Sequence, residues 1–590
     1  MKGAVAGWAV LATLGVMASA GLTGVAVAQQ SRPVSGGNLQ GGGNLQGGGN
    51  PLGGNPLGGN PLDALPQINA PQKAPSVTVQ VQQQTPALQQ LLATHLTPTT
   101  FKVEGVKSIP FDEVASRFAP LANHDITIGQ LIETANGVTK LYQDRGYALS
   151  FAFVPAQDFA GGVVHITVVE GYVKDVKITG QPGALEGKMR AIAAHIAADR
   201  PLRTATFQRY INVLGMLPGL KVKANVAPPT TTDGATTLEL DATHKAYDVS
   251  TGIDFNHPGV QGLITLTENG LTPFGEQLSF SALLPKGRDN VTYLAAHAAV
   301  PIASDGLTAR LDASHYRGNP VDNPGLPNYV ERTVISDKLT GSLSYPLLLS
   351  NTRSLVGTVS AYAAHDEDRY HNTINGLQYG LSSQVRVVQL QADYTDVKPD
   401  QVRKASIAVA KAFDVLGASK SADTNIPGLA LQNPVSLNFV RTNASYSQTN
   451  DWPMGFGTSV AATGQYSPNT LPTSEQISFG AQRFAAGYEP GEASGDSGWA
   501  FALELNHPFK LGKVWLQTIT PYVSFDMARV YLHAGTPSPS RLSSASLGFR
   551  ITDGKYYSLD LSVAKALADA PIESASRSPR LNATFSYQLN

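Results

Sequence analysis

One histidine and three acidic residues form the densest group of side chains that could do chemistry. His365, Asp366, Glu367 and Asp368 follow one another in the sequence. Imidazole and carboxylate groups bind divalent metal ions, but a site built on this run would need further ligands from elsewhere in the chain. Hydrophilic loops commonly carry acidic runs of this kind, so we interpret the cluster as a solvated loop segment.

No motif for catalysis accompanies this cluster. The sequence lacks the G-x-S-x-G, P-loop and H-E-x-x-H patterns. It also lacks cysteine, which excludes disulfides, thiolate metal sites, iron–sulfur clusters and cysteine nucleophiles. The 12 histidines show no ligand spacing. We therefore expect neither an enzyme nor a bound cofactor or metal ion.

The composition argues against nucleic acid as a partner and is compatible with a membrane protein. Of 590 residues, 43 are Lys or Arg and 44 are Asp or Glu, which gives a net charge of −1. Only 15% of the residues are charged, against roughly 25% in soluble domains. No internal stretch of about 18 apolar residues occurs, so a membrane-spanning form would have to be a β-barrel.

The first 96 residues have the features of an export signal and a linker. Lys2, an apolar run over 4–27 and the sequence Ala-Val-Ala at 26–28 are typical of a secretory signal peptide over 1–28. A retained membrane anchor is the alternative. Residues 29–96 are predicted to be a Gly/Asn/Pro-rich linker, because such a tract cannot bury enough apolar surface to fold. A fold made of short repeats is the alternative here.

Two small α+β units are predicted next, at 97–171 and 172–246. In the first unit, apolar residues recur at helical spacing from Ile128 to Tyr142, which predicts a helix over about 127–145. Strands are predicted in this unit at 147–154 and 163–169. For the second unit the pattern predicts strands at 172–178, 222–226 and 237–242 and helices at 185–197 and 206–216.

A series of residues in the first unit resembles the "RGY … P-x-Q … G-x-V … EG" signature of the ShlB-type POTRA domain of haemolysin activators. The matching residues are Arg145, Gly146, Tyr147, Pro155, Gln157, Gly162, Glu170 and Gly171. The resemblance implies a domain that docks a substrate protein. We expect a free sheet edge at 147–154 or 163–169 to take on an extended client strand by β-augmentation.

Residues 247–590 alternate between apolar and polar side chains over many short segments. The last segment is the clearest, since Leu581, Ala583, Phe585, Tyr587 and Leu589 alternate with polar residues. A soluble sandwich or propeller would fit this pattern, but the signal peptide and the amphipathic last strand favour an outer-membrane barrel. We therefore predict α+β POTRA domains followed by an all-β, antiparallel transmembrane barrel of about 16 strands.

The segment 480–505 resembles the region around the "VRGY" motif of these transporters, a loop that in the family folds back into the barrel lumen. The candidate loop residues are Arg483, Gly487, Tyr488, Gly495, Asp496 and Gly498. In the family the motif arginine meets an acidic strand residue, which here is Asp526 after Phe525. Ala486 occupies the place of that arginine. Arg483, three residues upstream, is the substitute that we consider.

From about residue 96 onward the chain resembles an outer-membrane transporter of two-partner secretion, the ShlB/FhaC type. The resemblance implies POTRA domains in the periplasm and a monomeric barrel in outer-membrane lipid. It also implies a secreted exoprotein client, similar to filamentous haemagglutinin or haemolysin. A BamA-type assembly factor is the main alternative, although it usually carries more POTRA copies. A passive porin-like channel needs no POTRA domain, and a soluble β-rich adhesin would not need a membrane.

Overall fold

The computed structural model describes residues 92–589 apart from 160, 257–259, 287–289, 320–326, 430, 482–483, 536, 538 and 573–574. The described residues form two compact units, one made of 92–244 with 349–351 and the other of the remaining residues from 245 onward. The predicted signal peptide and residues 29–91 of the predicted linker lie outside the described residues. None of the described helices is long and apolar enough to cross a membrane.

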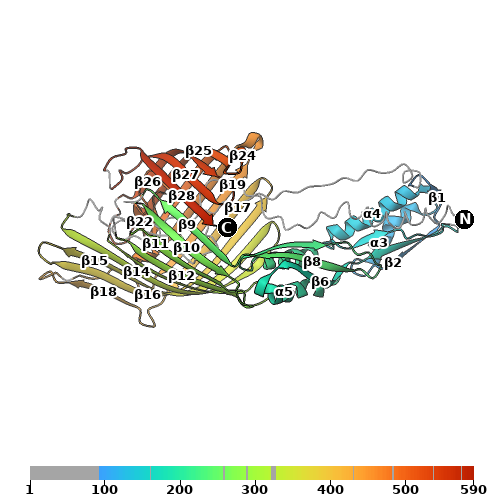
Figure 1. The fold of residues 1–590 in the computed structure, drawn as a ribbon, viewed down its shortest axis with the longest axis horizontal. Coiled ribbons are helices and arrows are strands. Elements are labelled where there is room, and N and C mark those ends of the chain that lie inside the picture. The colour runs from blue at the N-terminus through green and yellow to red at the C-terminus, as the bar shows by residue number, and fades with distance from the viewer. Residues whose placement is uncertain are drawn as a thin grey trace. The chain divides into compact units, whose positions relative to one another are not determined.

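The first unit begins with an α/β fold, where Figure 1 labels β2, α3 and α4. Its sheet has the order β2-β5-β4. Strand β2 is parallel to β5, whereas β4 is antiparallel to it. The elements are β1 (His95–Leu96), β2 (Thr100–Glu104), α3 (Phe111–Phe118), η2 (Ala119–Leu121), β3 (Ile126–Thr127), α4 (Ile128–Asp144), β4 (Phe151–Phe153) and β5 (Val163–Val169).

Helix α4 forms where the periodicity predicts it, and local signals fix both of its ends. Thr127 and Gln130 make a reciprocal capping box at its start. Gly146 follows its end with φ +88°, a left-handed conformation that glycine adopts readily. One face of the helix packs on the sheet through Leu131, Val138 and Tyr142, which are fully buried.

A second α/β fold follows within the same unit. Its sheet has the order β6-β8-β7, with β6 parallel and β7 antiparallel to β8. The two helices bury their apolar faces in a core of their own. The elements are β6 (Tyr172–Gln181), η3 (Gly183–Leu185), α5 (Glu186–Ala198), α6 (Thr204–Gly215), β7 (Leu220–Val226) and β8 (Ala235–His244).

The expectation of a free sheet edge is wrong for 163–169, whereas 147–154 contains an outer strand of the sheet. Strand β5 is the central strand and pairs with both β2 and β4. Strand β4 is an outer strand, but its middle residue is already bonded. Ala152 donates its backbone N–H to Thr139 Oγ1 of α4 at 3.0 Å, and the same hydroxyl lies 3.4 Å from the Ala152 carbonyl. The helix therefore covers this edge.

The second unit is a closed antiparallel β-barrel, as predicted. It contains eighteen strand segments among the described residues, but β17 and β18 both pair with β16, and β23 and β24 both pair with β25. Each of these two pairs continues one strand, so the barrel has 16 strands. Its first and last strands, β9 and β28, pair and close the sheet (Figure 1).

The strand bounds leave one long connection, 467–496, between β20 and β23. The barrel segments are β9 (Tyr247–Asp254), β10 (Gln261–Asn269), β11 (Gln277–Leu284), β12 (Thr292–Pro301), β13 (Thr308–Gly318), β14 (Val330–Leu349), β15 (Arg353–Asn372), β16 (Gln378–Lys398), β17 (Gln401–Ala412), β18 (Ser419–Thr424), β19 (Val440–Asp451), β20 (Gly457–Tyr466), β23 (Ser497–Asn506), β24 (Phe509–Lys513), β25 (Leu516–Tyr531), β26 (Arg541–Thr552), β27 (Tyr557–Ala566) and β28 (Arg580–Leu589).

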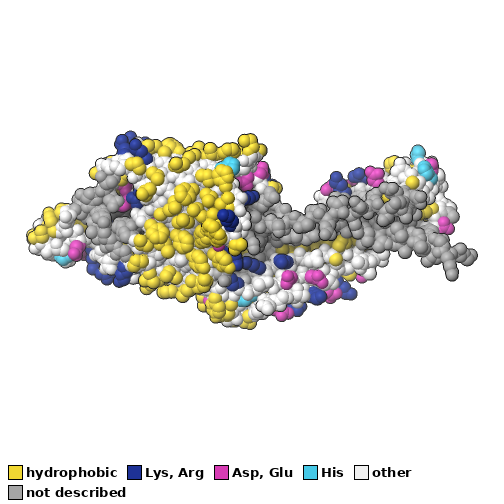
Figure 2. Space-filling view, turned by 45° about the horizontal axis from the view of Figure 1, so that its top comes forward, with side chains coloured by type: hydrophobic (Ala, Val, Ile, Leu, Met, Phe, Trp, Pro, Cys, Tyr) yellow, Lys and Arg dark blue, Asp and Glu magenta, His cyan; other side chains and the backbone are white. Residues whose placement is uncertain are grey.

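The two faces of each barrel strand differ as the alternation predicts. Large apolar side chains such as Leu266, Leu390 and Leu547 are exposed on the outer face. Figure 2 shows that apolar side chains gather in a broad band over the visible face of the barrel. Buried polar residues such as Arg441 and Asp526 alternate with them and point inward. This inside-polar, outside-apolar pattern is the one that a barrel in lipid requires.

The acidic cluster is not a loop, which corrects its interpretation as a solvated segment. Residues 365–368 lie within strand β15 and alternate between its two faces. Asp366 accepts a hydrogen bond from Ser336 Oγ at 2.9 Å, and Asp368 pairs with the Arg332 guanidinium at 2.6 Å. Barrel partners therefore bind these inward carboxylates. Among the described residues, no group of three or more His, Cys, Asp or Glu could hold a metal ion.

Candidate functional site

The first three signature residues of the α/β fold stabilise the end of helix α4. Arg145 Nη2 lies 2.8 Å from a carboxylate oxygen of Glu113 on α3. The Gly146 carbonyl accepts hydrogen bonds from Thr204, which begins α6 of the second α/β fold. The Tyr147 ring packs edge-on against Tyr142 with ring centres 6.1 Å apart.

Glu170 is the most highly bonded of the signature residues. Its carboxylate accepts hydrogen bonds from the backbone N–H groups of Lys107 at 2.9 Å and Ser108 at 2.7 Å. It also accepts from the Ser108 hydroxyl at 2.8 Å and from Tyr142 OH at 2.9 Å. Burial alone would raise the pKa of Glu170, but the bonds from Ser108 and Lys107 lower it below its ordinary value. Burial and this carboxylate raise the pKa of Tyr142, so the phenol remains a donor.

The remaining signature residues fix the approach of strands and loops. The Gln157 side chain accepts the His165 N–H at 2.7 Å and donates to the His165 carbonyl at 2.8 Å. It therefore satisfies the two backbone groups that a neighbouring strand would otherwise bond. The Pro155 carbonyl lies 3.4 Å from the same amide. A Cβ on Gly171 would lie 2.4 Å from the Leu149 carbonyl oxygen, and one on Gly162 would lie 2.8 Å from Thr99 Oγ1. All eight signature residues thus make contacts within residues 92–244.

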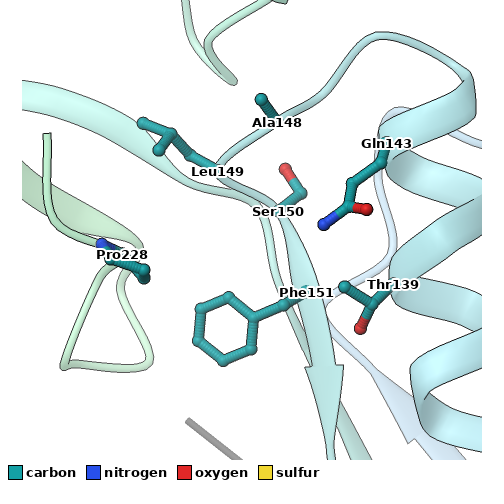
Figure 3. A pocket seen from close by; sticks show the side chains of 7 residues that line it. All are labelled: Thr139, Gln143, Ala148, Leu149, Ser150, Phe151 and Pro228. Carbon is teal, nitrogen blue, oxygen red and sulfur yellow. The ribbon is translucent and has the colours of Figure 1, made fainter. Parts of the chain in front are cut away.

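One small pocket lies beside helix α4 (Figure 3). Its volume is about 10 Å³, which leaves room for roughly one water molecule. It is too small for a cofactor or an extended peptide. Its lining residues are Thr139, Gln143, Ala148, Leu149, Ser150, Phe151 and Pro228.

The connection 467–496, which we call the lumen loop, crosses the inside of the barrel. It contains the short helix η5 (Thr473–Glu475) and a hairpin of β21 (Ile477–Phe479) and β22 (Ala493–Gly495). On one side, which we call the near wall, it bonds inward residues of β14, β15 and β19. On the other side, which we call the far wall, it packs on β25 to β28. Because these two walls belong to opposite parts of the strand order, the loop spans the lumen.

The loop meets Asp526 through its backbone. Asp526 is 4% exposed on β25, and its Oδ2 accepts the Ala486 N–H at 3.4 Å and the Ser544 hydroxyl at 3.3 Å. The alanine that replaces the motif arginine therefore still contacts the family's acidic partner. Phe525, the preceding residue, is partly exposed on the outer face. Arg483, the candidate substitute, lies outside the described residues.

Gly487 and Tyr488 pack the tip of the loop against the far wall. A Cβ on Gly487 would lie 2.6 Å from the backbone nitrogen of Ala566 on β27, so only glycine allows this approach. Tyr488 is fully buried and donates its OH to the Asp569 carbonyl at 2.8 Å. It belongs to an apolar cluster with Phe479 of the same loop and Leu542 of β26.

Asp496, Gly495 and Gly498 hold the end of the loop where it joins β23. Asp496 is fully buried and accepts the backbone N–H groups of Leu471 at 2.7 Å and His533 at 2.8 Å. A Cβ on Gly495 would lie 2.4 Å from the Tyr531 carbonyl oxygen, and one on Gly498 would lie 2.8 Å from that of Arg529. These three positions bring the loop close to β25.

Sequence reasoning missed the charged contact at the near wall. Glu475 of η5 lies 2.9 Å from Arg441 Nη2 of β19, and both side chains are fully buried. Neither residue belongs to a recognisable motif, and the pair forms only when the loop folds into the barrel. An acidic residue inside a loop sequence gives no signal that a distant strand supplies its partner.

The sequence matches two families. Residues 96–171 match the ShlB-type POTRA domain, and residues 336–551 match the haemolysin secretion/activation protein ShlB/FhaC/HecB. The heme/hemopexin transporter protein HuxB of Haemophilus influenzae is 20% identical over 481 residues, which cover 77% of this chain and 80% of that protein. The hemolysin transporter protein HpmB of Proteus mirabilis is 20% identical over 476 residues, covering 78% and 80%.

Two solved structures share the fold. CdiB from Escherichia coli superposes with a TM-score of 0.64 at 18% identity, covering 86% of this chain and 93% of that one. BamA from Haemophilus ducreyi lacking POTRA domains 1–3 gives a TM-score of 0.52 at 12% identity, covering 84% and 100%. These likenesses establish the fold, which transporter and assembly factor have in common. The family matches separate the two, and the chain is an outer-membrane β-barrel transporter of the ShlB/FhaC type, with periplasmic POTRA domains, that secretes exoprotein.

Proposed function

We propose that this transporter exports one large exoprotein, similar to filamentous haemagglutinin or haemolysin, which its POTRA domains capture in the periplasm. The observation that carries this proposal is that one chain contains both an α/β domain of ShlB type and a 16-strand barrel whose lumen holds a long loop. The names of the relatives HuxB and HpmB, which refer to heme/hemopexin and hemolysin transport, support a client of this class. The periplasm contains no ATP, so folding of the client at the cell surface would drive export.

Deletion of the gene is expected to remove one large protein from the culture medium and leave the other outer-membrane barrels at their normal level. Mass spectrometry of the medium and of the outer-membrane fraction measures both. Complementation with the intact gene should restore the missing protein. A general loss of outer-membrane barrels with an unchanged medium would favour the BamA-type alternative instead.

We propose that the client strand adds to the outer edge of β2. The Thr100 N–H donates to the Gly162 carbonyl at 3.1 Å, on the side of β5. Because backbone groups of successive strand residues point to alternate sides, those of Phe101 and Val103 point away from β5. No hydrogen bond of these outward groups occurs among the described residues. The edge at β4 is covered by α4, so β2 is the better acceptor of a further strand in this domain.

A proline at Val103 should reduce client capture without dissolving the domain. Val103→Pro removes an outward N–H and leaves the ladder with β5 intact, so we expect secretion to fall about tenfold while the barrel still assembles. Val103→Ala is the matched control, because it shortens the same side chain and keeps the N–H. Pull-down of the client on the full-length protein gives the comparison. Equal binding by the two variants would exclude the β2 edge as the docking strand.

We also propose that Arg483 is the side-chain partner of Asp526, since it is the arginine nearest in sequence to Ala486. A guanidinium–carboxylate pair would add a charge-assisted bond to the backbone contacts already present. If the two residues act as one unit, Arg483→Ala, Asp526→Ala and the double variant should impair export equally. Additive losses would mean that they act separately.

A further inference from the structure

Glu475 occupies a buried cluster of two cations and a phenol on the inner wall of the barrel. Its Oε2 lies 2.9 Å from Arg441 Nη2 of β19 and accepts the Tyr362 hydroxyl of β15 at 2.8 Å. Lys338 Nζ of β14 lies 3.8 Å from Oε1 and 3.9 Å from the centre of the Tyr362 ring. Three strands of the wall therefore converge on one carboxylate of the lumen loop.

Neighbouring contacts of η5 with this wall are also polar. Ser474 Oγ lies 2.5 Å from Asp366 Oδ2, and the other oxygen of Asp366 accepts the Ser336 hydroxyl. Gln465 donates its side-chain amide to the Glu475 carbonyl at 3.0 Å. The near wall thus binds η5 through charges and hydrogen bonds, while Leu471 of the same loop is buried in an apolar cluster with Tyr362 of β15.

The far wall binds the same loop with a larger aromatic and apolar cluster, beside an ion pair of Glu489 with Arg580 at 3.2 Å. Tyr488 and Phe479 are buried among small and apolar residues of β23, β25, β26 and β27. Gly487 lies directly against the backbone of β27. Withdrawing this end would expose aromatic surface to the aqueous lumen, which is unfavourable.

Separating the Glu475 contacts themselves exposes charged groups, which water can solvate. A carboxylate and a guanidinium regain hydration when they part in a water-filled lumen, and that hydration offsets much of the lost attraction. In this structure the Arg441 guanidinium is incompletely bonded, since its Nε and Nη1 have no hydrogen-bond partner among the described residues. Breaking the ionic contacts at the near wall therefore costs less free energy in water than withdrawing the aromatic side chains from the far wall.

We propose that the Glu475–Arg441 pair is the releasable latch of the lumen loop, and that the far wall keeps the loop anchored when the latch opens. Both are positioning residues that place the loop across the path of the client. This inference rests on the proposed export function for its purpose. The latch itself can be measured without any client.

Neutralising Glu475 is expected to open the pore. Glu475→Gln keeps the size of the side chain and removes its charge, and we expect the full-length protein in planar lipid bilayers to open at least about fivefold more often. The loop should also become accessible to added protease. Arg441→Gln should act alike, and the double variant should add nothing further. Glu492→Gln is the matched control, because it removes a carboxylate of the same loop that is buried at the far wall.

A disulfide can test the same idea by closing the latch. The chain has no cysteine, so Ser474→Cys with Asp366→Cys introduces a single pair at two side chains that are in contact. We expect the oxidised protein to lose its openings and its export, and a reductant to restore both. Heat-modifiable migration on gels shows that each barrel has folded.

Two results would overturn the latch: oxidised and reduced protein that open equally, or Glu475→Gln with unchanged openings while Glu492→Gln increases them. Failure of the unaltered protein to export any exoprotein, with conductance changing as expected, would count against the proposed function and leave the latch standing.

Discussion

Replacing Glu170 by alanine is expected to lower the free energy of unfolding of the first POTRA domain by about 3 kcal/mol and to stop export. The Glu170 carboxylate accepts four hydrogen bonds, from Lys107, from Ser108 twice and from Tyr142. Each such bond contributes roughly 1 kcal/mol net, and the backbone donors would lose their acceptor. Because the loss falls within the domain, the barrel should still insert.

The same carboxylate predicts a pH dependence with a definite sign. Hydrogen bonds from Ser108 and Lys107 outweigh burial and hold the pKa of Glu170 below its ordinary value of 4.5. A lowered pKa in the folded state means that the carboxylate stabilises the domain fully above that ordinary value. This contribution is lost as the pH falls through the folded-state pKa. In Glu170→Ala this part of the acid sensitivity should disappear.

Hydrogen exchange of the α4 amides in the full-length protein measures the effect, together with the amount of client in the medium. Glu133→Ala is the control, since Glu133 is an exposed carboxylate on the same domain. Unchanged exchange in Glu170→Ala would show that the four bonds contribute little to the stability of this domain.

Gly487→Val is expected to displace the tip of the lumen loop and leave the pore conducting. Its first side-chain atom would lie 2.6 Å from Ala566 N and 2.8 Å from the Lys565 carbonyl carbon, both backbone atoms of β27. Backbone in a closed barrel cannot move aside as a side chain can. Overpacking of this kind costs about 1–3 kcal/mol, which shifts a closed-to-open ratio about 5- to 150-fold.

Single-channel recording and cell sensitivity to antibiotics too large for porins measure this opening. Gly341→Ala is the matched control, because a Cβ on this barrel glycine meets no atom within 4 Å. If Gly487→Val conducted like the unaltered protein, the loop tip would not contribute to closure. If the pore opened in Glu475→Gln but not in Gly487→Val, the contacts that close the pore would lie at the near wall alone.

Local patterns in the sequence determined most of the fold. Alternation along strands such as β28 predicted an amphipathic barrel, and the length of the region predicted about 16 strands, which is confirmed. The spacing from Ile128 to Tyr142 predicted α4, because a helical period is a property of neighbouring residues. The signature at 145–171 predicted a POTRA domain of ShlB type, which is also confirmed.

Pairing between distant segments was decided only by the tertiary structure. The sequence placed strands at 147–154 and 163–169 but did not reveal that β5 is central or that Thr139 covers β4. The sequence also predicted a solvated loop at 365–368, whereas these residues lie in β15 and two of their carboxylates bind partners inside the barrel. Glu475 and Arg441 are the clearest case, since each belongs to an unremarkable stretch of sequence. A charge pair between a loop and a distant strand depends on where the chain folds back, and strand alternation specifies which face a residue takes but not what it meets there.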